Sequence, residues 1–383
     1  MVERKSALES VVIDAGFWRG RRVFLTGHTG FKGGWTALVM RSVGADVTGF
    51  SLAPECREGI FSAAEVSQDV RHVIGDIRDP QALRAAMDAA RPEIVIHMAA
   101  QSLVRRSYLE PVDTYATNVM GTVHALEAVR QSAGVQAVVV VTSDKCYENV
   151  GHVHGYTEDE PLGGSDPYSN SKACAELVTQ AYRRSFFDNS FPLPVASARA
   201  GNVIGGGDWA QDRLVPDAMR AFLGGRTLDI RNPQSLRPWQ HVLDPVLAYM
   251  LLAERLVENG AAFAEAWNFG PGPDSEIAVR QIADMLARGW GDGAAWRHDR
   301  SQHPAESAYL KLDCAKAAAR LGWRPLLNTE RSIDLTLDWY RAFQRGANMR
   351  QVTLSQISEV VAAARGARAA ETLSAGTHPS APP

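Results

Sequence analysis

A tyrosine and a lysine stand four residues apart at the start of a predicted helix and could carry out acid–base chemistry. Asp166 and Pro167 precede them and suit the N-cap and the first turn of a helix. Side chains at positions i and i+4 share a helix face, so the Lys172 ammonium could lower the Tyr168 pKa from about 10 toward the working pH. The resulting phenolate could accept the proton of a substrate hydroxyl. Ser143 ends a predicted strand and could bind the same substrate oxygen, which favours this interpretation over a surface Tyr–Lys pair.

Three glycines between the first predicted strand and the first predicted helix suit the binding of a dinucleotide. In TGHTGFKG, Gly27 permits a tight turn and Gly30 lets backbone N–H groups approach a pyrophosphate. Gly33 allows close packing of the helix whose N-terminus faces that anion. A glycine-rich turn that binds nothing is the alternative, but the position after the first strand of a βαβ series favours the dinucleotide. The candidate cofactor residues of this loop are Gly27, Thr29, Gly30, Phe31, Lys32 and Gly33.

The end of the second predicted strand lacks the carboxylate that usually binds the adenosine ribose of NAD. This segment reads GFSL (49–52), so Ser51 is the candidate cofactor residue there and the choice between NAD and NADP stays open. Arg57 could meet a 2′-phosphate. After the third predicted strand, Asp76 and Ile77 could lie near the adenine. An Asp76 that caps the following helix is an equally good interpretation.

Alternating strand-like and helix-like segments must position these groups. The β-rich runs are RVFLTG, ADVTGFSL, VRHVIGDI, PEIVIHMAA, QAVVVVTSD and a strand at 194–199. Helical segments such as DPQALRAAMDAAR and TYATNVMGTVHALEAVRQS separate them. This alternation predicts an α/β fold with a Rossmann-like, doubly wound parallel sheet, followed by a smaller C-terminal substrate-binding α/β lobe. Amphipathic helices of that lobe are expected at 277–289 and 331–343.

The predicted division of the chain follows from this alternation. We expect an N-terminal extension (1–18), a dinucleotide-binding domain (19–200, with returning segments near 238–270), a second lobe (201–237 and 271–345), a C-terminal helix (346–365) and a tail (366–383). The Ala, Gly, Ser, Thr and Pro content of the tail predicts no folded structure.

Composition excludes several classes of partner. A formal net charge of −3 and a pI near 6.4 offer no basic footprint for nucleic acid or an anionic membrane, so a small-molecule substrate is expected. The four cysteines form no CxxC pair, so neither a disulfide framework nor a metal site is expected, and a reducing cytoplasm fits. The sequence shows no secretory signal and no transmembrane run, which predicts a soluble protein.

Several stretches resemble the extended short-chain dehydrogenase/reductase family. They are the glycine loop at 26–33, HMAAQ (97–101), Ser143 and YSNSK (168–172), and the likeness covers about Trp18 to Phe343. Within that family, SDKCYEN, DPYSNSKACAE, SARAGNVIGGGDWAQDRLVPD and IRNPQSLRPWQHV are similar to the 4,6-dehydratases that act on CDP-glucose. The resemblance implies a lyase that uses NAD, with NADP left open.

The resemblance also implies a reaction on a nucleotide sugar. Tyr168, assisted by Ser143 and Lys172, would take the proton of the C4 hydroxyl while hydride leaves C4. Water would then be lost across C5 and C6, and hydride would return to C6, which gives a 4-keto-6-deoxy sugar. Similar dehydratases that act on dTDP-glucose carry an Asp-Glu pair where this chain has Asp144 and Lys145. Asp144 would protonate the departing hydroxyl, and Lys145 could take the C5 proton if burial depresses its pKa. A turn ion pair is the alternative.

Binding residues are carried over from the same stretches. Ala99, Ala100, Gln101 and Asn118 are expected at the cofactor, together with Tyr168 and Lys172. The substrate candidates are Ser102, Arg106, Asn202, Arg213, Leu214 and Arg237, with His303 and Glu306 as weaker ones. Arg105 could share this role, but we expect one of the two neighbouring arginines to be merely solvated. Trp209 and Trp239 could stack on a pyrimidine, although packing is the favoured interpretation.

Three alternatives stay open at this point. An epimerase or a decarboxylase of the same family would share the glycines and the Tyr–Lys pair, as would a dehydratase for dTDP-glucose, GDP-mannose or a UDP-sugar. Asp144 and Lys145 argue against a simple epimerase, which needs no proton donor at C6. A non-catalytic dinucleotide sensor or scaffold would not require Ser143, Tyr168 and Lys172 together. The likeness further implies a homodimer through helices near 112–132 and 168–187.

Overall fold

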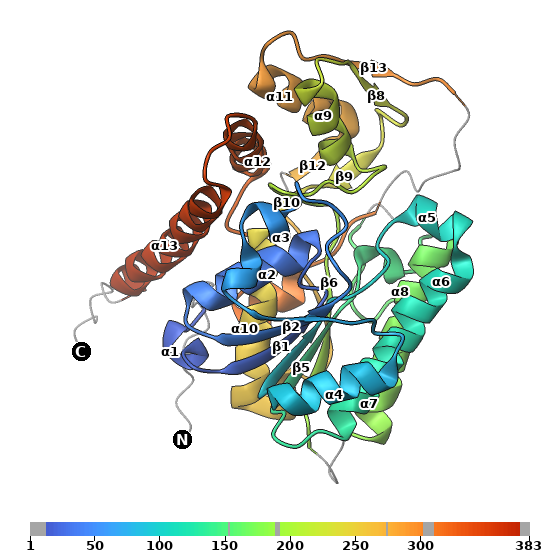
Figure 1. Cartoon of the computed structure of the whole chain (residues 1–383), viewed down its shortest axis with the longest axis vertical. Coiled ribbons are helices and arrows are strands. Elements are labelled where there is room, and N and C mark those ends of the chain that lie inside the picture. The colour runs from blue at the N-terminus through green and yellow to red at the C-terminus, as the bar shows by residue number, and fades with distance from the viewer. Residues whose placement is uncertain (1–12, 152–153, 188–191, 273–274, 302–309, 376–383) are drawn as a thin grey trace, which may run out of the picture.

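A parallel sheet forms the centre of the molecule (Figure 1). The computed structural model describes residues 13–151, 154–187, 192–272, 275–301 and 310–375, the last ten or so as backbone only. Among these, seven strands pair in the order β11-β6-β5-β4-β1-β2-β3, and every neighbouring pair is parallel. The order reverses between β1 and β4, where such sheets bind ligands. The strands are β1 (Arg22–Thr26), β2 (Asp46–Ser51), β3 (Arg71–Ile74), β4 (Ile94–His97), β5 (Ala137–Val141), β6 (Val195–Arg199) and β11 (Ala266–Asn268).

Both faces of the sheet are covered because successive strand residues point to opposite sides. Val23 and Leu25 pack into one apolar cluster with residues of α2 and α10, whereas Phe24 packs into another with residues of α4 and α7. These helices are α2 (Phe31–Ser42), α4 (Pro80–Ala90), α7 (Gly121–Arg130), α8 (Pro167–Ser185) and α10 (Leu243–Asn259). Shorter helices are α1 (Ala15–Trp18), α3 (Ile60–Ala63), η1 (Val66–Gln68), α5 (Val104–Leu109), α6 (Pro111–Tyr115), η2 (Ala116–Met120) and η3 (Asp144–Cys146).

A second lobe lies above the carboxyl ends of the strands in Figure 1. It is built on paired short strands, with β9 antiparallel to β12 and β8 parallel to β13. Between its segments the chain returns to the sheet through β10, α10 and β11. The elements of this half are β7 (Val203–Ile204), α9 (Leu214–Leu223), β8 (Leu228–Ile230), β9 (Leu236–Pro238), β10 (Gln240–His241), η4 (Gly260–Phe263), β12 (Glu276–Ala278), α11 (Val279–Trp290), β13 (Trp296–His298), η6 (Ala317–Leu321), α12 (Thr329–Gln344) and α13 (Met349–Ala375).

The predicted α/β fold is confirmed, and one local expectation is wrong. The segment 114–132 is helical as predicted as far as Arg130, with a π-helical turn at η2 that contains Asn118. The C-terminal helix was expected to end at 365, but α13 continues through Ala375, because the alanine-rich stretch there favours helix.

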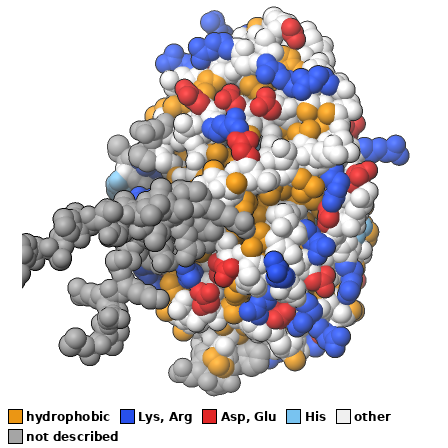
Figure 2. All heavy atoms as spheres, turned by 90° about the vertical axis from the view of Figure 1, so that its left-hand side faces the viewer, with side chains coloured by type: hydrophobic (Ala, Val, Ile, Leu, Met, Phe, Trp, Pro, Cys, Tyr) orange, Lys and Arg blue, Asp and Glu red, His pale blue; other side chains and the backbone are white. Residues whose placement is uncertain are grey.

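The surface carries charges of both signs. Figure 2 shows Lys and Arg side chains interspersed with Asp and Glu on one face. None of the helices in the described part of the chain combines the length and the apolar character that crossing a bilayer requires.

Candidate active site

The turn between β1 and α2 is shaped by two glycines. Gly27 adopts a φ of +80°, and a Cβ there would lie 2.8 Å from the backbone of Ala99. A Cβ on Gly33 would lie 2.0 Å from the carbonyl oxygen of Gly27. The Thr26 hydroxyl accepts hydrogen bonds from the backbone of Met98 and Ala99, at 3.0 and 3.1 Å, which draws the end of β4 against the turn. Both glycines are therefore needed for this close approach.

The same turn has the features that an anion requires. Gly30 is the N-cap of α2 and provides no side-chain cap, so the first N–H groups of the helix have no side-chain acceptor at that position. A Cβ on Gly30 would meet only the Gly27 carbonyl oxygen, at 3.4 Å. Burial and the nearby Arg213 lower the pKa of the half-buried Lys32 to about 8. Phe31, also half-buried, opens the helix beside it. These groups fit the pyrophosphate of a dinucleotide.

The carboxyl end of β2 is polar but carries no carboxylate. The hydroxyls of Thr29 and Ser51 lie 2.8 Å apart, and Thr29 also donates to the carbonyl of Leu52 at 2.9 Å. Asp76 forms an ion pair with Arg78 at 2.6 Å, and the hydrogen bonds from Arg78 lower its pKa.

The proposed capping role of Asp76 is wrong. Asp79 caps α4, because it accepts hydrogen bonds from the N–H groups of Gln81 and Ala82. Ile77 is buried beside Gly121.

Gln101 and Asn118 hold the loop after β4 in place. The Asn118 amide accepts from the Gln101 N–H and donates to its carbonyl, both at 2.9 Å, and also donates to the Ser171 hydroxyl. Gln101 donates through its own side chain to Thr114. Both side chains therefore form hydrogen bonds with protein groups and fix the loop that carries Ala99 and Ala100. The hydrogen bond from Asn118 to Ser171 joins this loop to α8.

Tyr168 and Lys172 lie in the first turns of α8, which Asp166 caps as predicted. Both side chains are buried, and the Ser143 hydroxyl lies near the Tyr168 side chain. Lys172 donates to the carbonyl of Val141 on β5 at 3.4 Å. The structure therefore brings the predicted Ser–Tyr–Lys group together at the carboxyl end of β5.

The expected lowering of the Tyr168 pKa is wrong for this structure. Burial raises the pKa of Tyr168 to about 12, and the nearby Ser143 hydroxyl opposes the rise only in part. Burial and the positive charge of Lys32 lower the pKa of Lys172 to about 7. Because this lowering reduces the positive charge on Lys172, that charge does not offset the cost of burying a phenolate.

Asp144 follows Ser143 as the first residue of the η3 turn. It is buried, it accepts from the Ser143 hydroxyl at 3.0 Å, and Asn202 donates to its second oxygen at 3.3 Å. A Cβ on Gly201 would lie 1.9 Å from that second oxygen, so only glycine allows the contact. Lys145 is half-buried on the same turn.

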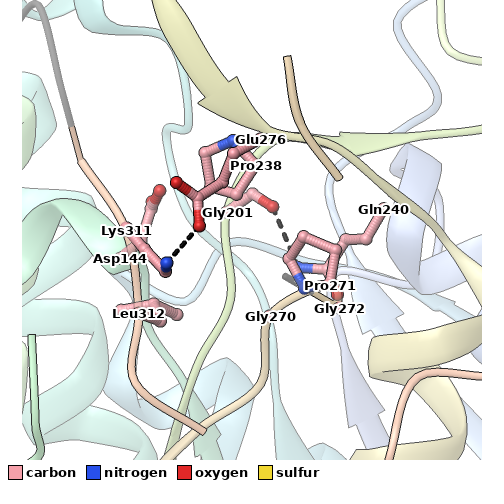
Figure 3. Close-up of a pocket in the computed structure, with 10 residues that line it drawn as sticks. All are labelled: Asp144, Gly201, Pro238, Gln240, Gly270, Pro271, Gly272, Glu276, Lys311 and Leu312. Carbon is pink, nitrogen blue, oxygen red and sulfur yellow. Dashed lines mark hydrogen bonds and ion pairs between the residues drawn. The ribbon is translucent and has the colours of Figure 1, made fainter. Parts of the chain in front are cut away.

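A small cavity of about 10 Å³ opens beside Asp144. Asp144, Lys311 and Leu312 lie on one side of it and Gln240 and Gly272 on the other (Figure 3). A volume of this size holds about one water molecule. The remaining lining residues are Gly201, Pro238, Gly270, Pro271 and Glu276.

Arg213 joins the two lobes near Ser102 and Asp208. It precedes α9, donates to the Ser102 hydroxyl at 3.0 Å and pairs with Asp208 at 3.2 Å. Its charge also acts on Tyr168 and Lys32. Leu214 follows it as the first residue of α9.

The remaining arginine candidates for substrate binding lie at different depths in the structure: one is buried and one is exposed. Arg237 is buried on β9 beside Pro238 of the cavity. Arg106 was a substrate candidate, with one of the two neighbouring arginines expected to be solvated; it is exposed and pairs with Glu110 and Glu55. Successive helix residues point about 100° apart, and it is Arg105 that reaches the second lobe, through an ion pair with Asp212 at 2.8 Å.

Three further expectations concern the second lobe. Trp209 packs against Tyr340 and Phe343, and Trp239 belongs to the apolar core, as the packing interpretation predicted. His303 and Glu306 lie outside the described residues.

The sequence-based assignment missed a buried ion pair behind the site, Glu176–Arg199. Glu176 follows Lys172 by one helical turn, and Arg199 ends the β6 strand. Two opposite charges at these positions were the signal in the sequence that could have revealed the pair.

Gly33→Ala is expected to weaken NAD binding about tenfold, because the added methyl group overlaps the Gly27 carbonyl and overpacking costs about 1–3 kcal/mol. Ser42→Ala, on the exposed end of the same helix, is the control and should bind NAD normally. Titration calorimetry with NAD measures both. Unchanged affinity in Gly33→Ala would show that the turn does not hold the cofactor.

A family model described as GDP-mannose 4,6 dehydratase matches residues 24–336. The chain belongs to this family. The resemblance to the extended short-chain dehydrogenase/reductases is confirmed by this match, and the resemblance to the 4,6-dehydratases of CDP-glucose by the first of the relatives that follow. The CDP-glucose 4,6-dehydratase of Salmonella typhimurium is 49% identical over 92% of this chain and 99% of its own length. The dTDP-glucose 4,6-dehydratase of Streptomyces antibioticus is 32% identical over 74% of this chain and 80% of its own.

Solved structures of the family share the fold. The dTDP-glucose 4,6-dehydratase of Streptomyces venezuelae, solved with NAD bound, is 27% identical, with a TM-score of 0.71 over 85% of this chain and 98% of that one. A UDP-glucose 4-epimerase from Brucella ovis, in complex with NAD, matches with a TM-score of 0.71 and 25% identity over 83% of this chain and 97% of that one. Dehydratase and epimerase thus share one architecture, so the side chains of the site must decide the reaction.

Proposed function

We propose that this chain is an NAD-dependent CDP-glucose 4,6-dehydratase, which forms CDP-4-keto-6-deoxyglucose and water with no net consumption of cofactor. The observation that carries the proposal is the placement of Asp144. It is a buried carboxyl group beside Ser143 and at the edge of a cavity, next to the buried Tyr168–Lys172 pair. An epimerase has no leaving hydroxyl that needs such an acid. The relative from Salmonella typhimurium agrees with this assignment.

In the oxidation half, Tyr168 takes the proton of the C4 hydroxyl and Ser143 holds the same oxygen. Lys172 lies behind them and favours the phenolate when protonated. A bound NAD would supply the hydride acceptor for C4 and the hydride donor for C6, and its positive charge would favour the phenolate further. The turn at Gly27, Gly30 and Gly33, with Lys32, Thr29 and Ser51, would hold it.

In the elimination half, the C4 ketone acidifies the C5 proton. Lys145 on the η3 turn accepts that proton, and Asp144 donates a proton to the C6 hydroxyl, which leaves as water. After hydride has reached C6, the proton held by the base returns to C5. The electron pairs balance within the sugar, so no outside oxidant is required. The proton that Tyr168 took from the C4 hydroxyl must replace the one that Asp144 gave to the leaving water, which closes the proton balance.

The diphosphate of the substrate lies between the lobes in this proposal. Arg213 and Arg237 supply guanidinium groups, which suit phosphate oxygens, and Asn202 supplies an amide. Arg105 joins them, since it faces Asp212 beside Arg213.

The proposal includes a homodimer in the cytoplasm. Large apolar side chains are exposed on α5, α6, η2 and α8, where the helices of a partner subunit would cover them, and we assign the interface to this surface. They are Tyr108, Leu109, Val112, Met120, Leu177 and Phe186. All four cysteines are free thiols, which suits a reducing compartment.

The function is tested by incubating the purified protein with CDP-glucose, dTDP-glucose, GDP-mannose and UDP-glucose. The absorbance of the 4-keto-6-deoxy product in alkali should rise fastest with CDP-glucose. Product from another nucleotide sugar alone would reassign the substrate. No product from any of them, combined with interconversion of C4 epimers, would favour the epimerase.

A further inference from the structure

A buried polar cluster lies behind the groups assigned to catalysis. The side chains of Glu176 and Arg199 are each 3% exposed and form an ion pair at 2.9 Å. Glu176 also accepts hydrogen bonds from the hydroxyls of Thr142 and Ser197, the latter at 2.6 Å. An ion pair is costly to bury unless hydrogen bonds satisfy its remaining donors and acceptors. The neighbours that supply these bonds must therefore stay in fixed positions.

Tyr147 connects this ion pair to the catalytic turn. Its hydroxyl accepts from Arg199 at 2.6 Å and donates to Asn268 at 2.7 Å. The Arg199 guanidinium also lies over the Tyr147 ring, 4.8 Å from its centroid. The ring also stacks on that of Tyr156, with centroids 5.2 Å apart. Tyr147 is therefore held by buried groups at both its hydroxyl and its ring.

The contact between Tyr147 and Arg199 matters because of where Tyr147 lies in the chain. Tyr147 is the residue directly after the η3 turn, which carries Asp144 and Lys145. Tyr168 and Lys172, by contrast, lie on α8, a long element of the core. Ser143 begins the η3 turn as its N-cap, two residues after β5 ends, so it lies at the near end of the turn. Fixing Tyr147 thus fixes the far end of the turn that holds the acid and the base, while the C4 oxidation group has supports of its own.

We propose that Tyr147, through its hydrogen bond with Arg199, is a positioning residue for the elimination of water and not for the oxidation at C4. This inference rests on the proposed dehydratase function. An acid and a base must be held within a fraction of an ångström of their target atoms, and a displacement of about 1 Å lowers rates about a hundredfold. Loss of the Tyr147 hydroxyl frees one end of the turn.

Tyr147→Phe should separate the two halves of the reaction. After mixing with CDP-glucose, the near-ultraviolet absorbance of reduced cofactor should appear at close to the normal rate and then persist. Formation of the 4-keto-6-deoxy product should slow about tenfold to a hundredfold. Tyr156→Phe is the matched control, because its hydroxyl faces Asn149 and Val150 in the same cluster and not Arg199. It should leave both rates unchanged.

Arg199→Lys provides a second variant. Lysine can reach Glu176 with its ammonium but lacks the planar fork that serves Tyr147 at the same time. It should show the same separation of rates as Tyr147→Phe, and it keeps the test open if the phenylalanine variant does not fold, as judged by circular dichroism.

Three outcomes are decisive. Equal slowing of both steps in the folded variants, or no slowing at all, would overturn the positioning role. The same separation in Tyr156→Phe would assign the effect to general loosening of the cluster and would also overturn it. If the unmodified protein neither reduces its cofactor nor forms product with CDP-glucose, it is the proposed function that fails.

Discussion

Tyr168→Phe is expected to lower kcat with CDP-glucose about 10²–10⁴-fold while leaving the dissociation constant of the nucleotide sugar nearly unchanged. Phenylalanine keeps the ring and its buried packing on α8 but removes the only atom of this side chain that can take the C4 proton. The defect should lie in the first half of the reaction. No reduced cofactor should therefore accumulate, which stopped-flow absorbance measures directly.

Tyr182→Phe on the same helix is the control, because Tyr182 lies at the opposite end of α8. Its turnover should equal that of the unmodified protein. If Tyr168→Phe turned over undiminished, Tyr168 would have no part in the proton transfer.

Asp144→Asn is expected to lower product formation about 10²–10³-fold, with the opposite signature. An amide has the size of the carboxyl group and can still contact Ser143 and Asn202, but it cannot donate a proton to the leaving C6 hydroxyl. Oxidation at C4 should continue, so reduced cofactor should accumulate and the 4-keto-6-deoxy product should not. Chemical quench and analysis of the nucleotide sugars would identify the trapped 4-keto hexose.

Asp159→Asn makes the same chemical change at an exposed carboxylate and should have no effect. Rapid product formation by Asp144→Asn would transfer the acid role to another group. A combined loss of oxidation and elimination would instead indicate that Asp144 supports the position of Ser143.

The burial of Tyr168 predicts that its ionisation depends on bound ligands. Its pKa lies near 12 because burial penalises the phenolate, and Lys172, with a pKa near 7, provides only part of a positive charge. Since an opposite charge favours the ionised form, a bound cation should lower the Tyr168 pKa. Transfer of the C4 proton is then coupled to the presence of oxidised cofactor.

Much of the fold could be predicted because its signals are local in the chain. The β-rich runs and helical segments alternate in sequence, and parallel strands require such crossovers, so the Rossmann-like sheet followed from pattern alone. Gly27 and Gly33 were identified for the same reason, since a turn between adjacent elements has few possible conformations. Asp166 and Pro167 mark the start of α8 by chemistry confined to one turn.

What the sequence determined by itself was therefore the order of elements, the turn for the dinucleotide, and the types of side chain at the ends of β5 and α8. Only the tertiary structure decided the environment of those side chains. It raised the Tyr168 pKa, turned Arg105 rather than Arg106 toward the second lobe, and placed Arg199 against Glu176. Desolvation and ion pairing depend on groups that are distant in the chain and meet only after folding, and no local spacing encodes them.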